Sequence, residues 1–188
     1  MTTTAAPVRE RILDAATRRY YADGIRAVSA DRLIAEAGVS KVTFYRHFPT
    51  KDDLITAYLM QQVATVEDAL TQKRAELDGD SAGVLRWYAE ELGAFACTPG
   101  FRGCPFINAA AELSQPEHPG HRVVMEHRTW LVSQFGELLT ELGVDDVDSK
   151  ADQLMMLRDG AMVAGYVGRT PKAVAGTLTA AGRAVIGC

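Results

Sequence analysis

Five side chains within residues 41–47 carry hydrogen-bond donors or a positive charge: Lys41, Thr43, Tyr45, Arg46 and His47. Such groups donate to phosphate oxygens and to the acceptor edges of bases in duplex nucleic acid. In the same stretch, only Val42, Phe44 and Phe48 are available for packing. A helix this short is not stable alone, so neighbouring elements must hold it while its polar side faces a partner.

The residues before this segment predict how it is positioned. Gly38 follows a short apolar-periodic helix that Ser29 can cap, and glycine readily takes the left-handed conformation that ends a helix. Ser40 then stands where the next helix needs an N-cap. Two short helices joined by a tight turn predict a helix-turn-helix unit, with its second helix in the major groove of DNA.

The run AEAGVSKVTFYRHFPTKDDL is similar to the DNA-binding region of TetR-family regulators, and the similarity covers about a quarter of the chain. The residues that match the family pattern are Ala35, Ala37, Gly38, Val39, Ser40, Tyr45, Phe48 and Lys51. The resemblance implies a repressor that binds a palindromic operator as a homodimer and is released by a small, largely apolar effector. The DNA-binding residues would be Ser40, Lys41, Thr43, Tyr45, Arg46, His47 and Lys51, with Ser40 and Lys51 on the DNA backbone.

The composition is that of a soluble globular protein, with 188 residues, 47% hydrophobic and 23% charged. No apolar run approaches the roughly 18 residues of a membrane span, and the N-terminus lacks the order of a signal peptide. An odd number of cysteines, three, does not predict a disulfide framework. We therefore expect the protein in the cytoplasm.

The net charge of −4 is unusual for a DNA-binding protein, but the charges are unevenly distributed. Residues 1–51 hold nine Lys or Arg against five Asp or Glu, a balance of +4, which leaves −8 for the remainder. A basic head on an acidic body favours phosphate contact at one end only.

The hydrophobic periodicity predicts an all-α fold of about nine helices. A three-helix head over residues 1–50 would carry the helix-turn-helix, and residues 51–188 would form a helical effector-binding and dimerisation body. Outside the helix-turn-helix, the predicted helices are 8–22, 51–77, 83–96, 104–113, 121–142, 150–169 and 170–186. Thr50 is the expected N-cap of the long helix that joins head and body, and Thr170 with Pro171 is expected to start the last helix.

The middle helices combine large apolar side chains with a few polar ones, as the walls of a small-molecule pocket do. The candidate ligand-binding residues are Trp87, Glu91, Phe95, Phe106, Asn108, Met125, Arg128, Trp130, Met155, Arg158, Asp159 and Met162. Each of them could instead be an ordinary core residue. The resemblance favours the pocket, because it places the effector cavity among these helices.

The last two predicted helices are rich in small residues, which permit close approach of helices. These residues include Gly160, Ala161, Ala164, Gly165, Gly176, Ala180, Ala181 and Gly182. Tight packing within one monomer would explain them, and so would a four-helix interface between two copies. The resemblance favours the homodimer, since the family pairs through its final two helices.

Two further groups of residues suggest alternative functions. Glu117, His118, His121 and His127 could bind a metal, although a solvated loop is the favoured interpretation. Cys97 and Cys104 could form a redox pair, although ordinary helix-end or core positions are favoured. A metal- or thiol-responsive regulator therefore remains an alternative. No catalytic motif or phosphate loop is present, so we expect no enzyme and no cofactor, with an enzyme built on an apolar pocket as the remote alternative.

Overall fold

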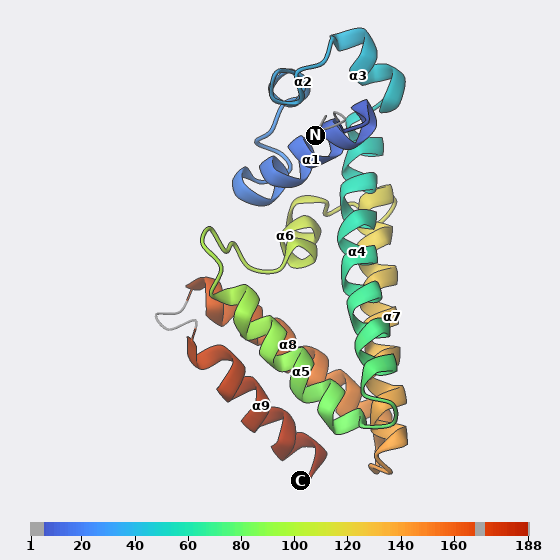
Figure 1. Cartoon of the computed structure of the whole chain (residues 1–188), viewed down its shortest axis with the longest axis vertical. Coiled ribbons are helices and arrows are strands. Elements are labelled where there is room, and N and C mark those ends of the chain that lie inside the picture. Colours follow the sequence, from blue (N-terminus) through green and yellow to red (C-terminus); the bar gives the residue numbers. More distant parts are fainter. Residues whose placement is uncertain (1–5, 168–171, 188) are drawn as a thin grey trace, which may run out of the picture.

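The computed structural model describes residues 6–167 and 172–187. Within these residues it contains nine α-helices and no strand, which confirms the predicted fold class. The helices are α1 (Val8–Asp23), α2 (Ala30–Ala37), α3 (Lys41–His47), α4 (Lys51–Glu76), α5 (Ser81–Ala96), α6 (Pro105–Glu112), α7 (Pro119–Glu141), α8 (Val147–Val167) and α9 (Lys172–Ile186). Helices α1–α3 form a head at one end, and α4 runs from it along the body beside α7 (Figure 1).

Local signals in the sequence build the turn between α2 and α3. Gly38 ends α2 with φ 62° in the left-handed region, as predicted. The Ser40 side chain accepts a hydrogen bond from the backbone N–H of Thr43 at 3.1 Å and so caps α3. Ser29 caps α2 in the same way through Arg32. The predicted caps of both helices are confirmed.

Ile12, Leu33, Phe44 and Phe48 of the head are all buried, in a hydrophobic core that continues into the body. Burial of each such side chain contributes about 1.5–3 kcal/mol, which holds the seven-residue α3 in place. The expectation that Val42 also packs is wrong, because its side chain is 79% exposed. Phe44 and Phe48 are four residues apart and share one face of the helix, and Val42 lies off that face.

Helix α4 connects head and body without a break. Thr50 and Asp53 form a reciprocal capping box at its start, which confirms Thr50 as the N-cap. Leu54 and Tyr58 of its first turns are buried, and the ring of Tyr58 meets that of Tyr20 edge-on at 5.6 Å. The first turns of α4 thus belong to the core of the head, and the rest of the helix packs on α5 and α7.

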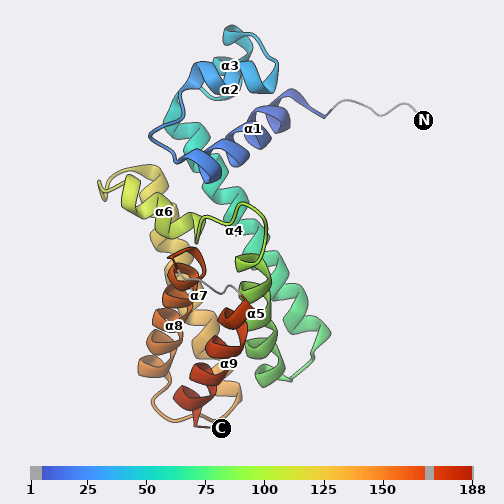
Figure 2. The ribbon, with the colours of Figure 1, turned by 90° about the vertical axis from the view of Figure 1, so that its left-hand side faces the viewer.

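The body consists of α5–α9 packed beside the lower part of α4 (Figures 1 and 2). Helix α7 begins at Pro119 rather than at His121, because Pro119 fills the first helical position and the imidazole of His118 caps the helix. Helix α8 begins at Val147, earlier than predicted. The predicted start of the last helix at Thr170 and Pro171 lies outside the described residues.

No helix in the described part of the chain combines the length and the apolar character that crossing a membrane requires.

Candidate nucleic-acid interface and ligand cavity

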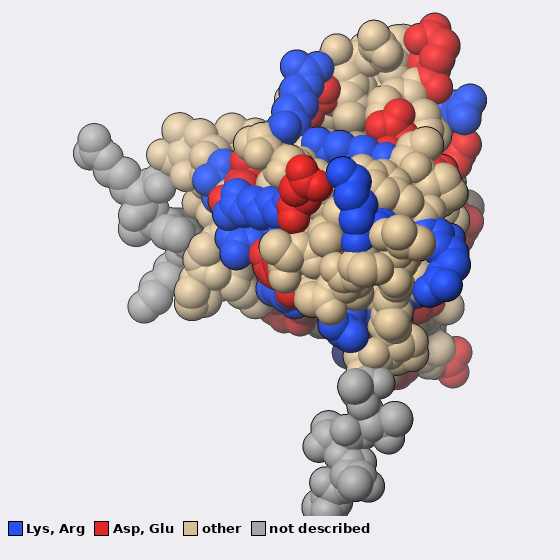
Figure 3. All heavy atoms as spheres, turned by 90° about the horizontal axis from the view of Figure 1, so that it is seen from above, with Lys and Arg blue, Asp and Glu red and all other residues tan. Residues whose placement is uncertain are grey.

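The outer side of α3 presents the predicted donors at the end of the head. Lys41, Tyr45 and Arg46 are exposed, and Thr43 and His47 are half-buried. Seen from the head end, Lys and Arg side chains lie around much of the surface with fewer carboxylates between them (Figure 3). This is the distribution that the uneven charge of the sequence predicts.

The donors on α3 differ in whether they already have partners inside the head. The hydroxyl of Ser40 donates to Oγ1 of Thr43 at 2.9 Å, and the ammonium of Lys41 lies 3.8 Å from Asp31 at the exposed surface. Within the described residues, the side chains of Tyr45, Arg46 and His47 make no hydrogen bond or ion pair. The ring of Tyr45 meets that of Phe44 edge-on at 5.3 Å. The three side chains can therefore bind an external partner without breaking an internal hydrogen bond or ion pair.

Lys51 has a partner within the chain that the sequence did not predict. Its ammonium donates to the backbone carbonyl of Ile25 at 2.7 Å, and burial lowers its pKa. The lysine therefore ties the start of α4 to the loop between α1 and α2. This geometry favours a structural role for Lys51 over the phosphate contact that remains its prediction from sequence.

Arg11 is a functional support that sequence reasoning missed. Its guanidinium donates to the carbonyls of Ala37 and Gly38, the latter at 2.9 Å, and so satisfies the free end of α2. The only signal in the sequence is a basic residue on the first helix, which does not say which carbonyl it reaches.

A second missed support joins the head to the body at α6. Both carboxylate oxygens of Glu112 accept backbone N–H groups of the head, from Ile25 at 3.0 Å and from Arg26 at 2.7 Å. The hydroxyl of Tyr21 donates to the carbonyl of Gly103 and thereby fixes the loop that leads into α6. The C-terminal end of α6 is thus hydrogen-bonded to the loop between α1 and α2.

The main cavity of the body lies between α4, α5, α6 and α8 and has a volume of about 270 Å³. Its walls are largely aromatic and aliphatic. Six of the predicted ligand-binding residues line it: Trp87, Glu91, Phe95, Phe106, Arg158 and Met162. The α4 wall, with Gln62, Thr65, Val66 and Ala69, was not predicted, because these residues look like the surface of a long helix.

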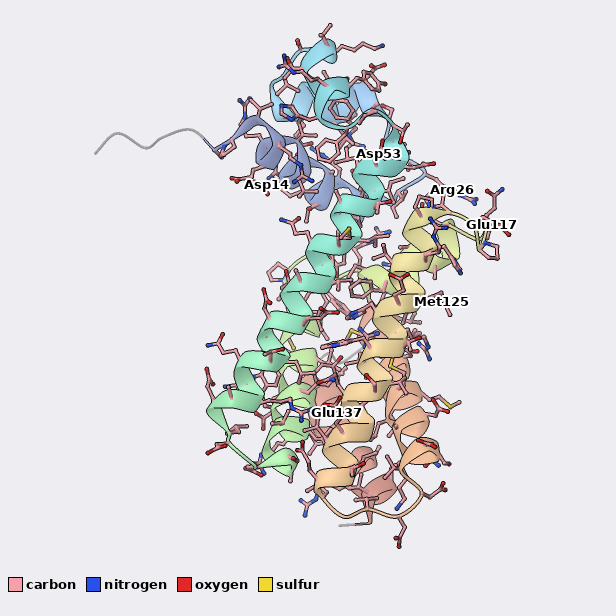
Figure 4. All side chains as sticks on the ribbon, turned by 90° about the vertical axis from the view of Figure 1, so that its right-hand side faces the viewer. Asp14, Arg26, Asp53, Glu117, Met125 and Glu137 are labelled. Carbon is pink, nitrogen blue, oxygen red and sulfur yellow. The ribbon has the colours of Figure 1, made fainter. Side chains whose placement is uncertain are left out.

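A smaller cavity of about 100 Å³ lies on the other side of Phe106 and Arg158, against α7. It collects the predicted residues Met125, Arg128, Met155 and Asp159. Met125 lines it from the exposed side of α7 (Figure 4). Ten of the twelve predicted residues thus line one of the two cavities.

Asn108 and Trp130 line neither of these cavities. The side-chain amide of Asn108 donates to the carbonyl of Arg102 at 2.8 Å and holds the loop before α6. Trp130 stacks on His127 with ring centroids 5.7 Å apart. Both residues support the cavity walls from outside.

Arg158 is the polar centre shared by the two cavities. It is buried, and its Nη1 donates to Asp159 at 3.0 Å and to Sγ of Cys104 at 3.2 Å, while Nε has no protein partner. Arg128 donates to the other oxygen of Asp159. Burial works against the guanidinium charge, but Cys104 and Tyr88 outweigh it and raise the pKa of Arg158.

His127 contradicts the expectation of a solvated loop, because it is only 4% exposed and lies within α7. Its ring stacks on Phe106 at 4.2 Å, and neither ring nitrogen has a hydrogen-bond partner in the protein. Burial and the charge of Arg158 lower its pKa to about 4, so the imidazole is neutral at pH 7. A neutral imidazole beside a cavity offers a ligand one donor and one acceptor.

The other residues of the metal and redox alternatives are separated in the structure. His118 caps α7, and Nδ1 of His121 lies 2.8 Å from the carbonyl oxygen of Leu113. Within the described residues, no three His, Cys, Asp or Glu side chains are grouped as a metal site. Cys97 is exposed at the end of α5, and Cys104 is buried.

The small residues of α8 and α9 serve two purposes. Gly165 lies close against Ala96 and Phe101 within the chain, as tight internal packing requires. By contrast, Gly160 and Gly176 have no neighbouring atoms where a side chain would stand. A shallow groove of about 420 Å³ runs between the two helices, and Gly160 lines it together with the apolar side chains of Met156 and Ala164. This open apolar face would suit a second helical surface.

Comparison with known proteins agrees with this geometry. Residues 12–58 match the family model of bacterial regulatory proteins, tetR family. The chain is 30% identical over 152 residues to the HTH-type transcriptional regulator LmrA of Bacillus subtilis, and the match covers 76% of each chain. It is similar to the crystal structure of SCO4454, a TetR-family transcriptional regulator from Streptomyces coelicolor, with 42% identity, a TM-score of 0.90 and coverage of 95% and 94% of the two chains. The relatives are named as regulators rather than enzymes, and the chain belongs to the TetR family of bacterial transcriptional regulators.

Proposed function

We propose that this regulator is a repressor that binds a palindromic operator as a homodimer in the cytoplasm and is released by a small, largely apolar effector. One observation carries the proposal. Helix α6 is bonded to the DNA-binding head through Glu112 at one end, and Phe106 at its other end forms a wall of both cavities. A ligand that moves Phe106 therefore moves an element to which the head is attached.

In the operator complex, α3 enters the major groove and Tyr45, Arg46 and His47 meet base edges and phosphates. Lys41 and Thr43 at the start of the helix contact the DNA backbone, together with Ser40. Arg18 and Arg19 form ion pairs with Glu36 inside the head, so these two arginines are not free to contact DNA. Specificity thus rests on the second half of α3.

Two copies would pair through the exposed faces of α8 and α9. The apolar side chains exposed there, Met156 and Val163 among them, are large enough to need cover, and a two-fold axis would bury the same face of each copy. The pairing would place two α3 helices about one DNA turn apart, or about 34 Å.

The effector would act by binding the released conformer more tightly than the DNA-bound one, since a ligand shifts an equilibrium only by its differential affinity. An apolar molecule in the main cavity contacts Phe106 and Trp87 and presents its polar end to Arg158. Displacement of Phe106 shifts α6, and the Glu112 contact transmits the shift to the loop before α2.

Filling the main cavity tests this proposal. Ala69→Trp adds a large side chain to the α4 wall, and Ala64→Trp adds the same side chain at an exposed α4 position that lines no described cavity. Compounds that release wild-type protein from its operator should lose at least about tenfold potency on Ala69→Trp, equal to about 1.4 kcal/mol. The same compounds should keep their potency on Ala64→Trp. Equal response of all three proteins would place the effector elsewhere.

A thiol-responsive regulator is a second candidate, favoured by the contact between Cys104 and the Arg158 guanidinium at 3.2 Å. If this candidate holds, a thiol oxidant releases wild-type protein from operator DNA and leaves Cys104→Ser bound.

A further inference from the structure

A third cavity lies at the end of the body away from the head, between α5, α7, α8 and α9. Its volume is about 250 Å³, and two of the helices that line it, α5 and α9, lie side by side (Figure 2). The walls are mainly aliphatic and aromatic, with Leu85, Phe135, Leu178 and Ile186 among them. This cavity shares only Tyr88 and Arg158 with the main cavity, so the two lie on opposite sides of that pair.

The charged residues of this third cavity are all arginines. Arg86 from α5, Arg158 from α8 and Arg183 from α9 line it, and no Asp or Glu does. Arg86 and Arg183 are exposed, and neither forms an ion pair with any described residue. The Nε of buried Arg158 lacks a protein partner. Arg158 is already paired with Asp159, so the free cations of the chamber are Arg86 and Arg183. An apolar chamber with two free cationic side chains and no carboxylate in its lining is complementary to an anion with an apolar tail.

We infer that this third cavity is a second ligand site, separate from the proposed effector cavity, for an organic anion with an apolar chain. The anionic head would lie between Arg86 and Arg183 near the surface, and the chain would extend inward along Phe135 and Leu178. A cavity of about 150 Å³ holds benzene, so 250 Å³ accommodates a chain of roughly ten carbon atoms. The ligand class is therefore a medium-chain carboxylate, or a sulfate or phosphate ester of a similar chain.

The site goes beyond the repressor proposal, and its test uses no DNA. The probes are decanoate, its neutral analogue decanamide and the cation decylamine, each titrated calorimetrically into the full-length protein below its micellar concentration. Decanoate should bind once per chain. Decanamide should bind roughly tenfold more weakly and decylamine not measurably, because a hydrogen-bonded charge pair contributes more than a neutral contact.

Variants distinguish the third cavity from the main one. Gly182→Leu fills the third cavity, since a β-carbon at Gly182 lies 3.7 Å from Leu154 and has room. Ala89→Phe fills it from α5, which covers the case in which the first variant fails to fold. Both should abolish decanoate binding, whereas Ala69→Trp in the main cavity should leave it intact. The double variant Arg86→Gln/Arg183→Gln should bind decanoate no better than decanamide.

Three results would overturn the inference. One is absence of decanoate binding to the wild-type protein. Another is equal affinity for decanoate, decanamide and decylamine, which would leave the arginines without a role. The last is decanoate binding that survives both fillers of the third cavity and disappears in Ala69→Trp, which would move the anion to the main cavity. None of these results bears on operator binding by α3.

Discussion

Two basic residues, Arg46 in α3 and Lys51 at the start of α4, differ in whether they have a partner within the chain. Arg46 is exposed and makes no bond within the described structure, whereas the ammonium of Lys51 is bound to the carbonyl of Ile25. Sequence reasoning gave both to DNA, because a lysine after the recognition helix matches the family pattern. Only the fold shows that the lysine faces inward, since its partner lies 26 residues earlier in the chain.

The two residues therefore give separable predictions. Arg46→Ala should weaken operator binding and lower the slope of log affinity against log salt by about one, as loss of one phosphate contact does. Lys51→Met should leave that slope unchanged and lower the free energy of unfolding by about 1–2 kcal/mol, because the Ile25 carbonyl loses its partner. Salt titrations of DNA binding and urea unfolding of both variants measure this. A lowered slope for Lys51→Met would show that Lys51 contacts a DNA phosphate after all.

His127 predicts a pH dependence of stability. The unfolded chain protonates this histidine near pH 6.5, and the folded chain keeps it neutral down to about pH 4. Between these values the unfolded state binds more protons, so acidification favours unfolding. Wild-type protein should lose about 2–3 kcal/mol more than His127→Phe between pH 7 and pH 4.5, because phenylalanine stacks without titrating. Parallel loss of stability in the two proteins would show that His127 is protonated in the folded state.

At the scale of the helices, the sequence predicts those features that depend on neighbouring residues, such as helix caps. The caps at Ser29, Ser40 and Thr50 and the left-handed Gly38 depend on residues three or four positions away, and all were correct. Contacts between distant elements were not predictable in this way. Glu112 meets a loop 86 and 87 residues away, and nothing in its neighbourhood distinguishes it from a surface glutamate.

The cavity walls were also only partly predictable from the sequence. Sequence reasoning found most of the walls on α5–α8, because large apolar and sparse polar residues stand out there, and it missed the α4 wall. It also placed Asn108 and Trp130 in the pocket, from their residue types and from the position of these helices in the family. In the structure, the amide of Asn108 donates to the Arg102 carbonyl, and Trp130 stacks on the His127 ring.

The contact between α6 and the head can be tested without an effector. Glu112→Gln replaces one acceptor oxygen with an NH₂ group that cannot accept the N–H of Ile25 or Arg26. The amides of these two residues should exchange with solvent roughly ten- to a hundredfold faster by NMR, for about 1.5–3 kcal/mol lost at a charged hydrogen bond. The control Glu117→Gln changes an exposed glutamate in the loop after α6 (Figure 4). Unchanged exchange in Glu112→Gln would mean that the head is held by other contacts.

At the scale of the whole molecule, the proposed binding to a palindromic operator requires two copies of the chain. The charge of the chain is divided between a basic head and an acidic body, and α8 and α9 lie in the body, away from the head (Figure 1). A single seven-residue helix reads only a few base pairs, so specific binding depends on a second copy held at fixed spacing.

A bulky residue on the open face should separate the copies. Ala164 is exposed in the groove between α8 and α9, so Ala164→Trp leaves the monomer fold unstrained and overpacks a close contact between helices. Sedimentation should show loss of the dimer in this variant. Ala111→Trp, at an exposed position of α6, is the control and should sediment as wild type does. A dimer of unchanged affinity in Ala164→Trp would locate the interface on another face.

Selection from random duplex DNA tests the proposal that α3 reads DNA sequence as part of a two-fold dimer. Wild-type protein should enrich a palindromic site whose two half-sites are centred about one helical turn, or about 10 base pairs, apart. Tyr45→Ala, which removes an exposed side chain of α3, should bind that site and random duplex with nearly equal affinity. Failure to enrich any site, or enrichment of the same site by Tyr45→Ala with undiminished affinity, would contradict the account.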